Sequence, residues 1–572
     1  MVKLTAAATK SIPRIIIFAL TLIYGLAGLF FRDPWKNEDA IGFGGMWTLF
    51  RGNSLDWVVP HLAGRDISLG TPLPYWIGAT LIEWFGPLIG AANAARLYSA
   101  VCFFSAALAI WYATYLLGRR REVQPMALAV GGQPDMKSYG MTLADGALLI
   151  FLACVGLAQR AHETTPMMAQ LMGISIVLYG TVRGLDKPWQ GGLWTGLGIA
   201  IVALSSNLTL SLIIVTSTII AVIASNAKLR FRWTLTSTVL GLIGFAIWPI
   251  IWYLADLSPH WRHIAQEGWR NMPEMRATPS IESLGFLSVN FWAYAWPVWP
   301  LAIISLAHWG RTKASGAWRA PHLCIPLSLF IGSLIYVLFR SEANEHDLLI
   351  LIPSLSIIAA FSLPVLKRSV ISFIDWFAMF SFTLIALAIW IIWLAKVTGY
   401  PETTAANIAR LLPGFESQFN LLAFVVALAI TGVWISVVRW RTSRAPKEIW
   451  RCLIISASGT TLMWVLLMTL WLPTINYAKT YRLVSARLVQ VVPSGGGCID
   501  TSNIGFAQLA SFSYFTKLNL RDDANCPWML THSQSEAKAY AQLNNKKLSL
   551  LWEDRRAADR DERLRLYEVI PE

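Results

Sequence analysis

Long apolar segments alternate with short polar ones over the first 472 residues of the chain. A run of about 20 apolar residues has the length of a helix that crosses the hydrocarbon core of a bilayer. We place thirteen such spans at approximately 12–31, 92–118, 143–160, 166–183, 189–206, 209–227, 233–255, 286–308, 322–339, 348–366, 370–395, 421–438 and 452–472. The pattern predicts an all-α polytopic membrane protein over residues 1–472.

The pattern changes after residue 472. Residues 473–572 are polar, and their apolar positions alternate at 488–492 and 548–552, which is the period of a half-buried strand. We therefore predict a small α/β domain at 473–572, following a transmembrane domain at 1–472.

The composition agrees with a membrane protein, because 55% of the residues are hydrophobic and only 14% are charged. The net charge is +14, but Lys and Arg gather in short clusters between apolar runs, such as 119–121 and 439–444. Such clusters are typical of cytoplasmic loops. The basic balance therefore indicates orientation and not nucleic-acid binding: the N-terminus is predicted to be cytoplasmic, and the C-terminal domain periplasmic.

The six cysteines form two groups. Four lie in apolar runs and are predicted to be buried thiols: Cys102, Cys154, Cys324 and Cys452. The other two, Cys498 and Cys526, lie in the polar tail, where a disulfide forms if the tail faces an oxidising compartment.

The first polar loop, residues 32–91, follows the first span and carries the acidic pair Glu38 and Asp39. Its segments 40–50 and 74–90 mix aromatic, Gly and apolar residues at lengths too short to span, which predicts helices in the membrane interface. A half-buried carboxylate there could deprotonate a hydroxyl acceptor as a general base. The same acids also suit the first turn of a helix that starts near Ala40, so both interpretations stay open.

A second acidic point, His162-Glu163, lies in a very short loop on the same predicted side. A short loop holds its charge at the membrane boundary, within reach of the first loop. No second histidine follows, so the zinc-protease motif is absent. The sequence establishes no cofactor requirement, but a carboxylate and a histidine could hold a divalent metal ion, with His162 and Glu163 as ligands.

Several cations on this side are candidates for binding the phosphate of a lipid headgroup, because Arg and Lys form strong charge-assisted hydrogen bonds to phosphate. They are Arg262, Arg270, Arg340, Lys479 and Arg482. The first two interleave with Trp261 and Trp269, a pattern that an amphipathic interfacial helix with snorkelling cations also explains.

Taken together, these features resemble the membrane-embedded GT-C glycosyltransferases, in the branch of the protein O-mannosyltransferases and the lipid A aminoarabinose transferases. The resemblance rests on the thirteen-span layout and on short motifs. These are Glu38-Asp39 after the first helix, Asp56-Trp57-Val58-Val59-Pro60, Glu163, Trp296-Pro297-Val298-Trp299-Pro300 and Ile350-Leu351-Ile352-Pro353.

The resemblance implies transfer of a hexosyl or pentosyl unit from a polyprenyl-phosphate donor to a lipid A, glycan or protein acceptor. The reaction would take place at the periplasmic face of the bacterial inner membrane. In this scheme Glu38 or Asp39 is the base, Glu163 positions the acceptor or a metal, and the cations hold the lipid phosphate.

The chain departs from the family at three places. The acidic pair has the reverse order, and two lysines of the family are replaced near Leu69-Gly70 and within 204–208. Two alternatives therefore stay open: a non-catalytic lipid-binding relative or scaffold, and a lipid transporter. The transporter is disfavoured because the predicted spans are nearly free of charge.

Overall fold

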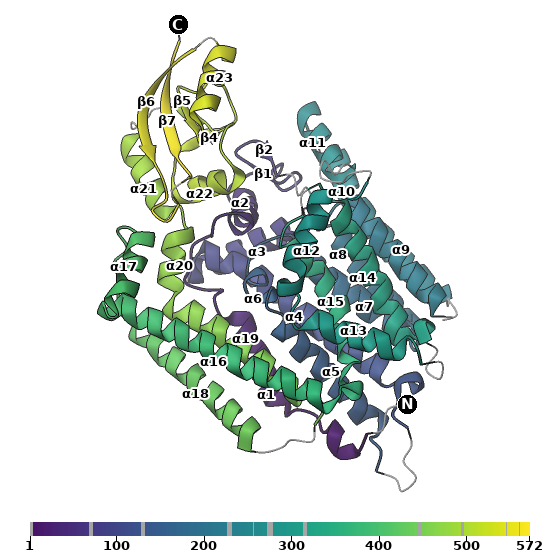
Figure 1. Cartoon of the computed structure of the whole chain (residues 1–572). Helices are drawn as coiled ribbons and strands as arrows, with labels where there is room; N and C mark the ends of the chain where they lie inside the picture. The colour runs from purple at the N-terminus through teal and green to yellow at the C-terminus, as the bar shows by residue number, and fades with distance from the viewer. Residues whose placement is uncertain are drawn as a thin grey trace.

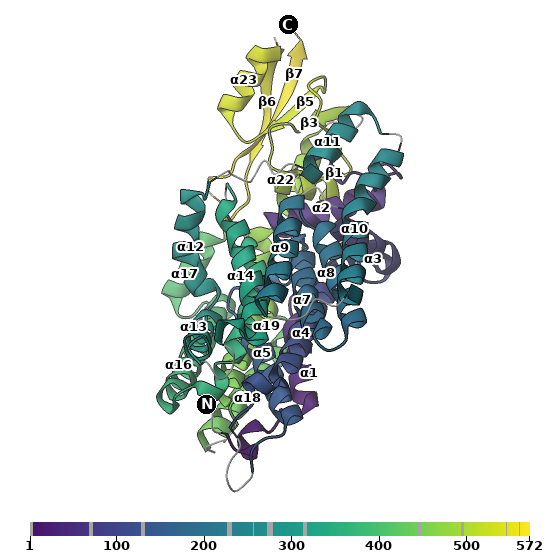
Figure 2. The ribbon, with the colours of Figure 1, turned by 90° about the vertical axis from the view of Figure 1, so that its right-hand side faces the viewer.

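A bundle of helices carries a small α/β domain at one end, and the two termini lie at opposite ends of the molecule (Figures 1 and 2). This arrangement comes from a computed structural model. It describes residues 4–67, 72–126, 132–225, 231–255, 257–270, 278–312, 317–341, 343–443, 448–492, 497–544, 546–559 and 561–571.

Eight helical segments of the described chain are long and apolar enough to cross a membrane. They are Ala6–Leu26, which contains α1 (Arg14–Leu26), α4 (Ala91–Gly118), α10 (Phe231–Leu254), α14 (Pro321–Phe339), Asp347–Val365, which contains α15 (Ile352–Ala360), α16 (Arg368–Thr398), α18 (Leu421–Ser443) and α19 (Arg451–Leu470). A ninth results if α12 (Ile281–Tyr294) and α13 (Val298–Trp309), which meet at a 94° bend, count as one span. The prediction of a multi-pass membrane protein is confirmed, whereas the count of thirteen spans is not.

Four other predicted spans coincide with shorter helices. These are α5 (Met136–Ala153), α7 (Met167–Gly184), α8 (Pro188–Ala203) and α9 (Leu208–Ala224). Helices α5 and α7 are buried along most of their length and form the centre of the bundle. α7 and α8 pack with their backbones in contact, since a Cβ atom added to Gly191 would lie 2.2 Å from Gly184. Small residues allow this approach, as they do in other membrane helix pairs.

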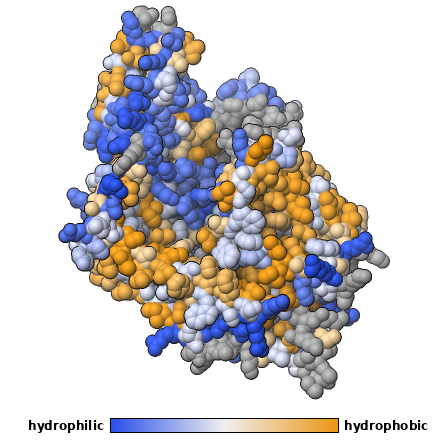
Figure 3. All heavy atoms as spheres, in the orientation of Figure 1, coloured by the Kyte–Doolittle hydropathy of each residue, from blue (hydrophilic) through white to orange (hydrophobic). Residues whose placement is uncertain are grey.

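The outside of the bundle is apolar. Large hydrophobic side chains of α16 and α18, such as Phe373, Trp376 and Leu422, are exposed. Figure 3 shows hydrophobic residues around the middle of the helical part, with hydrophilic residues gathered toward its ends. This distribution fits a bundle that is surrounded by lipid.

The first polar loop contains the two helices that its sequence predicts, α2 (Glu38–Arg51) and α3 (Leu73–Ile89). Between them lies a short hairpin of β1 (His61–Leu62) and β2 (Arg65–Asp66). α2 packs against α22 (Phe506–Phe515) of the polar tail, since a Cβ atom added to Gly44 would lie 2.5 Å from the Ala510 side chain. The loop is therefore held between the bundle and the tail.

The polar tail forms a five-stranded sheet in the order β4-β3-β5-β7-β6. The strands are β3 (Cys498–Asp500), β4 (Asn519–Arg521), β5 (Trp528–Thr531), β6 (Lys546–Asp554) and β7 (Leu564–Pro571). β3 pairs in parallel with β4 and β5, while β7 runs antiparallel to β5 and β6. A disulfide joins Cys498 to Cys526. The sheet agrees with the α/β domain that the alternating pattern predicts.

Short helices connect these parts. They are α6 (Leu157–Arg160), α11 (Pro259–Arg270), α17 (Glu402–Leu411), α20 (Leu472–Lys479), α21 (Arg482–Val491) and α23 (Gln534–Asn544). α20 and α21 lead from the last span into the sheet, so residues 472–491 lie between the bundle and the sheet (Figure 1).

Candidate active site

The two acids of the first loop have different surroundings, although they are adjacent in sequence. Asp39 is fully buried, and its carboxylate accepts hydrogen bonds from the Arg32 guanidinium (3.1 Å), the Trp35 amide (3.0 Å) and the Thr164 amide (2.9 Å). The Thr164 hydroxyl lies 3.0 Å from the same carboxylate. With both oxygens engaged, Asp39 fastens the first loop to the loop after α6.

Arg32 and Arg96 complete this anchor. Arg32 donates to the carbonyl of His162 at 2.6 Å, and Arg96 donates to the carbonyls of Arg32 and Asp33 at 2.8 and 2.7 Å. Both guanidiniums are buried, where a paired ion is far more stable than a single one. These contacts fix the backbone that leads into α2.

Glu38 is the first residue of α2, and among the described residues no hydrogen bond or ion pair engages its carboxylate. Burial raises the pKa of Glu38 above its ordinary value, and the charges of Asp347 and Glu163 raise it further. The charges of His346 and Arg340 act in the opposite direction. Glu38 is thus a carboxylate with a raised pKa and free oxygens, which is what a general base requires.

Glu163 is buried and belongs to an ion-pair network. One of its oxygens lies 2.5 Å from Nε2 of His346, and the other accepts hydrogen bonds from Arg160 (3.0 Å) and Gln159 (2.8 Å). Burial alone would raise the pKa of Glu163, but the His346 and Arg160 charges outweigh it and lower this pKa. Glu163 therefore stays ionised and holds the loop after α6 against the loop that carries His346.

Two further ion pairs border the network. Arg160 contacts Glu345 at 2.5 Å, and Arg340 contacts Asp347 at 3.2 Å. Arg340 is buried, so it can contribute positive charge to the cluster around Glu38. Of the cations predicted to bind phosphate, it is one of two near the acids.

Lys479, at the end of α20, is the other. Its ammonium lies 4.8 Å from the centre of the Trp35 ring, and among the described residues it has no carboxylate partner. Burial lowers the pKa of Lys479, while the charge of Glu163 raises it and that of Arg160 lowers it. Lys479 is therefore a half-buried cation beside the acids, available to an anionic ligand.

The remaining predicted cations lie elsewhere. Arg482 is bound to the Asp33 carboxylate through two nitrogens and stacks on the Phe515 ring at 4.7 Å. Arg262 is exposed on α11, where its guanidinium lies 3.5 Å from the carbonyl of Leu257. The backbone of Arg270 ends α11, and its side chain lies outside the described part of the chain.

The geometry does not suit the predicted metal site at His162 and Glu163. The two ring nitrogens of His162 lie 2.6 and 2.9 Å from the backbone carbonyls of Ala158 and Tyr24. Burial lowers the pKa of His162 to about 4. Within the described residues no group of three or more His, Cys, Asp or Glu could hold a metal ion. His162 serves to pack α6 against α1, and we assign no metal to this site.

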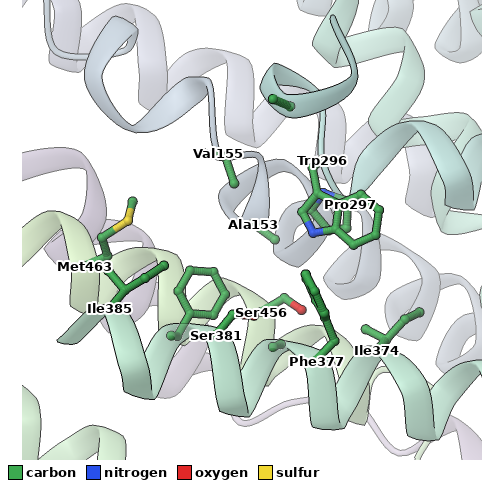
Figure 4. A pocket seen from close by; sticks show the side chains of 13 residues that line it. Ala153, Val155, Trp296, Pro297, Ile374, Phe377, Ser381, Ile385, Ser456 and Met463 are labelled. Atoms are coloured by element: carbon green, nitrogen blue, oxygen red, sulfur yellow. The ribbon is translucent and has the colours of Figure 1, made fainter. Parts of the chain in front are cut away.

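An apolar cavity of about 430 Å³ lies in the bundle next to this cluster (Figure 4). Trp296 and Val155 line one side of it, and Phe377, Ser381 and Ile385 of α16 line the other. The amide of Val155 donates to the carbonyl of Trp296 at 3.1 Å. Helix α6 begins two residues after Val155 and ends at Arg160. The cavity therefore lies beside the segment that leads into α6.

A hollow with hydrophilic residues separates the C-terminal domain from the helical part in Figure 3, and α2 lies at the same level in Figure 1. Ligands from water and from the bilayer could thus meet at this level. The sequence pattern points to the short loop that holds Arg340, His346 and Asp347, but not to Arg160. Arg160 could have been found from its helical spacing of three residues to Glu163.

The amino-acid sequence matches no protein-family model and no curated protein. The fold does have solved relatives. The crystal structure of ArnT from Cupriavidus metallidurans bound to undecaprenyl phosphate superposes with a TM-score of 0.61 and 15% identity, over 97% of each chain. The apo structure of the same protein gives a TM-score of 0.60 and 14% identity, also over 97% of each chain.

The chain therefore has the fold of the membrane-embedded GT-C glycosyltransferases. Within that class, its arrangement of helical bundle and C-terminal sheet is similar to that of ArnT over nearly the full length. A likeness at this sequence identity establishes the fold alone.

Proposed function

We propose that the chain is a glycosyltransferase that moves a sugar from a polyprenyl-phosphate donor to a hydroxyl group of an acceptor. The observation that carries this proposal is Glu38, a carboxylate with a raised pKa and no protein partner among the described residues, in the same cluster as Lys479 and Arg340. A base and a set of cations are the two parts that such a displacement needs.

In the proposed reaction, Glu38 takes the proton of the acceptor hydroxyl while the oxygen attacks the anomeric carbon of the sugar. The bond between that carbon and the phosphate oxygen breaks, and the electron pair leaves with the polyprenyl phosphate. Lys479 and Arg340 would neutralise the charge that develops on this phosphate. Glu163 and Asp39 would act as positioning residues, since other side chains already engage their oxygens.

A lipid-linked donor is supported by the apolar cavity beside the cluster (Figure 4). Its lining is almost entirely hydrocarbon, and it adjoins α6, so an isoprenoid chain could occupy it while the phosphate reaches Lys479. ArnT, which shares the fold, has been crystallised with undecaprenyl phosphate. We infer the same class of carrier for this chain.

The proposed setting is the bacterial inner membrane, with the N-terminus in the cytoplasm and the C-terminal domain, residues 473–572, in the periplasm. A disulfide between Cys498 and Cys526 favours this orientation, because disulfides persist in oxidising compartments such as the periplasm. The acceptor is a hydroxyl-bearing lipid, glycan or protein.

The test begins with the lipid that copurifies with the full-length chain in a membrane nanodisc. Mass spectrometry should detect polyprenyl phosphate or its sugar-loaded form. On addition of a sugar-loaded polyprenyl phosphate and a membrane lipid extract, the wild-type chain should release the free carrier, and Glu38→Gln should not. Equal release by both proteins would refute the assignment of the base.

The argument for a non-catalytic protein is that two lysines of the family are replaced in this sequence. One replacement, near Leu69-Gly70, lies outside the described residues, and the other is in the turn before α9, where Asn207 caps the helix. Lys479 supplies a cation that has no carboxylate partner within the described part of the chain, which favours the enzyme. Carrier binding without release in the wild-type chain would favour the scaffold.

A further inference from the structure

We propose that a second cavity, beneath the C-terminal domain, binds the neutral saccharide part of a glycan acceptor. This inference deepens the function proposed above and rests on it. The cavity has a volume of about 680 Å³ and lies between Arg32-Asp33, the start of α4, the segment before α18, and helices α20, α21 and α22. Four of these elements adjoin the ends of candidate spans, so the cavity lies at the level where the membrane domain meets the C-terminal domain.

Aromatic rings form much of its wall. Phe415 and Tyr477 lie 5.2 Å apart, and the Tyr477 hydroxyl donates to the carbonyl of Pro413 at 2.7 Å, which fixes the ring. Tyr514 of α22 lies across the cavity and packs edge-on to Phe43 at 4.7 Å. The faces of these aromatic rings can stack on the apolar C–H faces of sugar rings. Because the protein rings are already held in place, they lose little conformational entropy when a sugar binds.

Phe31 is a fourth ring at this cavity, and its conformation needs a reason. Its side chain is 87% exposed, and its backbone has φ +64°, a left-handed value that is uncommon for a non-glycine residue. The Phe31 amide donates to the Asn93 side chain at 3.2 Å, which helps to hold this conformation. An exposed aromatic ring in a costly conformation is typical of a ligand-binding position.

Two polar side chains of the cavity have N–H donors that no described residue accepts. The Asn476 oxygen accepts from the Asp33 amide (2.9 Å) and the Trp35 indole (3.1 Å), while its amide nitrogen has no partner among the described residues. Arg482 gives Nε and one terminal nitrogen to Asp33, so its other terminal nitrogen is free within the described chain. Donors of this kind pair with sugar hydroxyls.

The charges of the lining distinguish a saccharide from an anion. Arg482 is paired with Asp33, and Arg32 is paired with Asp39. An anion site would need a cation without a carboxylate partner, and each arginine of this cavity has one. The arginines of the lining are thus already paired with carboxylates, and the lining is aromatic and rich in donors, which favours a sugar chain over a phosphate.

The cavity and Glu38 are joined by one short stretch of chain. Asp33 lines the cavity, and Glu38 follows five residues later, so their Cα atoms are separated by at most about 18 Å. An oligosaccharide of a few sugar units can cover that length. The cavity would hold the remote part of the acceptor while its reacting hydroxyl approaches Glu38.

The experiment uses the full-length chain in nanodiscs, because maltoside detergents are themselves saccharides. Saturation-transfer NMR with cellotetraose and chitotetraose as probes should show transfer to at least one of them. Phe415→Ala and Tyr477→Ala should each reduce the signal about fivefold, because each removes an aromatic wall. Phe373→Ala, which removes an exposed ring of α16 that does not line the cavity, should keep the signal.

Phe31→Gly is the most selective variant, because glycine adopts a positive φ without strain. The variant should have a melting temperature at or above that of the wild type, because strain is relieved and an exposed ring is lost, and it should lose most of the saccharide signal. Absence of transfer to either probe in the wild type, or equal signals in the wall variants, would overturn the proposal. So would displacement of the probes by inorganic phosphate, which would identify an anion site.

The two proposals fail in different ways. If the chain binds a saccharide probe but never releases the lipid carrier, the proposed glycosyltransferase activity is wrong and the proposed saccharide site stands. If the chain releases the carrier but binds neither probe, the proposed activity stands and the proposed saccharide site is wrong.

Discussion

The carboxylate of Glu163 and the imidazole of His346 lie 2.5 Å apart, although 183 residues separate them in sequence. The pair fastens the loop after α6 to the loop before α15, and both loops border Glu38. Breaking one partner of a buried pair leaves a charge without compensation, which typically costs about 3–5 kcal/mol. The architecture around the proposed base therefore depends on this contact.

The stability supplied by this pair should depend on pH. The pKa of Glu163 is lowered below its ordinary value of 4.5, so its contribution is present above pH 4.5 and disappears as the pH falls through the folded-state pKa. The pKa of His346 is raised above 6.5 by Glu163, although burial opposes this, so its contribution is complete below pH 6.5 and disappears at higher pH. The melting temperature of His346→Gln should therefore fall furthest below wild type between these values, and the gap should narrow toward alkaline pH.

Arg487→Gln is the matched control for that measurement. It removes an exposed ion pair with Asp554 in the C-terminal domain, which should change stability by about 1 kcal/mol or less. A His346→Gln gap that is constant from pH 5 to pH 9 would show that the pair is not ionised as the structure indicates.

Glu38→Gln and Asp39→Asn should have opposite effects. Glu38→Gln removes a carboxylate that has no partner within the described chain, so the protein should fold normally and lose transfer activity. Asp39→Asn removes the charge that Arg32 faces and disturbs the contacts to Thr164, so it should destabilise the protein by about 3 kcal/mol or more. Melting temperature and carrier release, measured on the same preparations, would separate the two roles. If Asp39→Asn were stable and inactive while Glu38→Gln stayed active, Asp39 would be the base and Glu38 would not.

The rate of transfer should follow the ionisation of Glu38. Because burial raises its pKa above 4.5, the rate should rise with pH through a pKa above that value, as the carboxylate becomes able to accept a proton. The measurement is initial rate against pH at saturating donor. Glu38→Asp should keep an acidic limb with a changed midpoint, whereas the residual rate of Glu38→Gln should lack it. An acidic limb that persists in Glu38→Gln would belong to another group.

The sequence pattern predicts helices well and their geometry poorly. The apolar run at 286–308 reads as one span, but the structure bends it by 94° between α12 and α13, and hydropathy alone carries no information about a bend. The loop helices α2 and α3 follow from short amphipathic segments. Hydrophobic runs thus predict the helices, whereas the exact length and bend of each helix come only from the structure.

The site shows the same limit. Sequence places Glu38, Asp39 and Glu163 on one side, but not which acid of the pair is buried, because consecutive helical residues point about 100° apart. That difference depends on Arg32 and Thr164, which are distant in sequence from each other. The pairing of Glu163 with His346 likewise depends on the packing of α7 and α15, which no local pattern contains.

Lys479 should contribute to binding of the lipid phosphate. Lys479→Met keeps the length of the side chain and removes its charge, so the affinity for undecaprenyl phosphate should fall about tenfold, which corresponds to one charge-assisted hydrogen bond. Lys479→Arg should recover most of it. Arg262→Ala is the control, because Arg262 is exposed on α11 and contacts only a backbone carbonyl among the described residues. A larger loss in Arg262→Ala than in Lys479→Met would move the phosphate site to α11.

Asn37 places Glu38 through its backbone. Its φ of +72° and ψ of −141° fall in a region that non-glycine residues rarely adopt, and its side chain makes no capping hydrogen bond. Such a conformation costs about 1–3 kcal/mol, whereas a glycine there costs about 0.4–1 kcal/mol through the entropy of the unfolded chain. The relief of strain outweighs this entropic cost, so Asn37→Gly should raise the melting temperature, and Asn37→Val should lower it.

Activity should move in the other direction. Glycine at position 37 allows more backbone conformations before Glu38, so the carboxylate would be positioned less firmly, and carrier release by Asn37→Gly should slow by about tenfold. Both quantities can be measured on one preparation. A variant that is more stable and slower would show that the strained peptide serves to hold the base. A variant that is less stable would show that Asn37 stabilises the loop through contacts of its side chain.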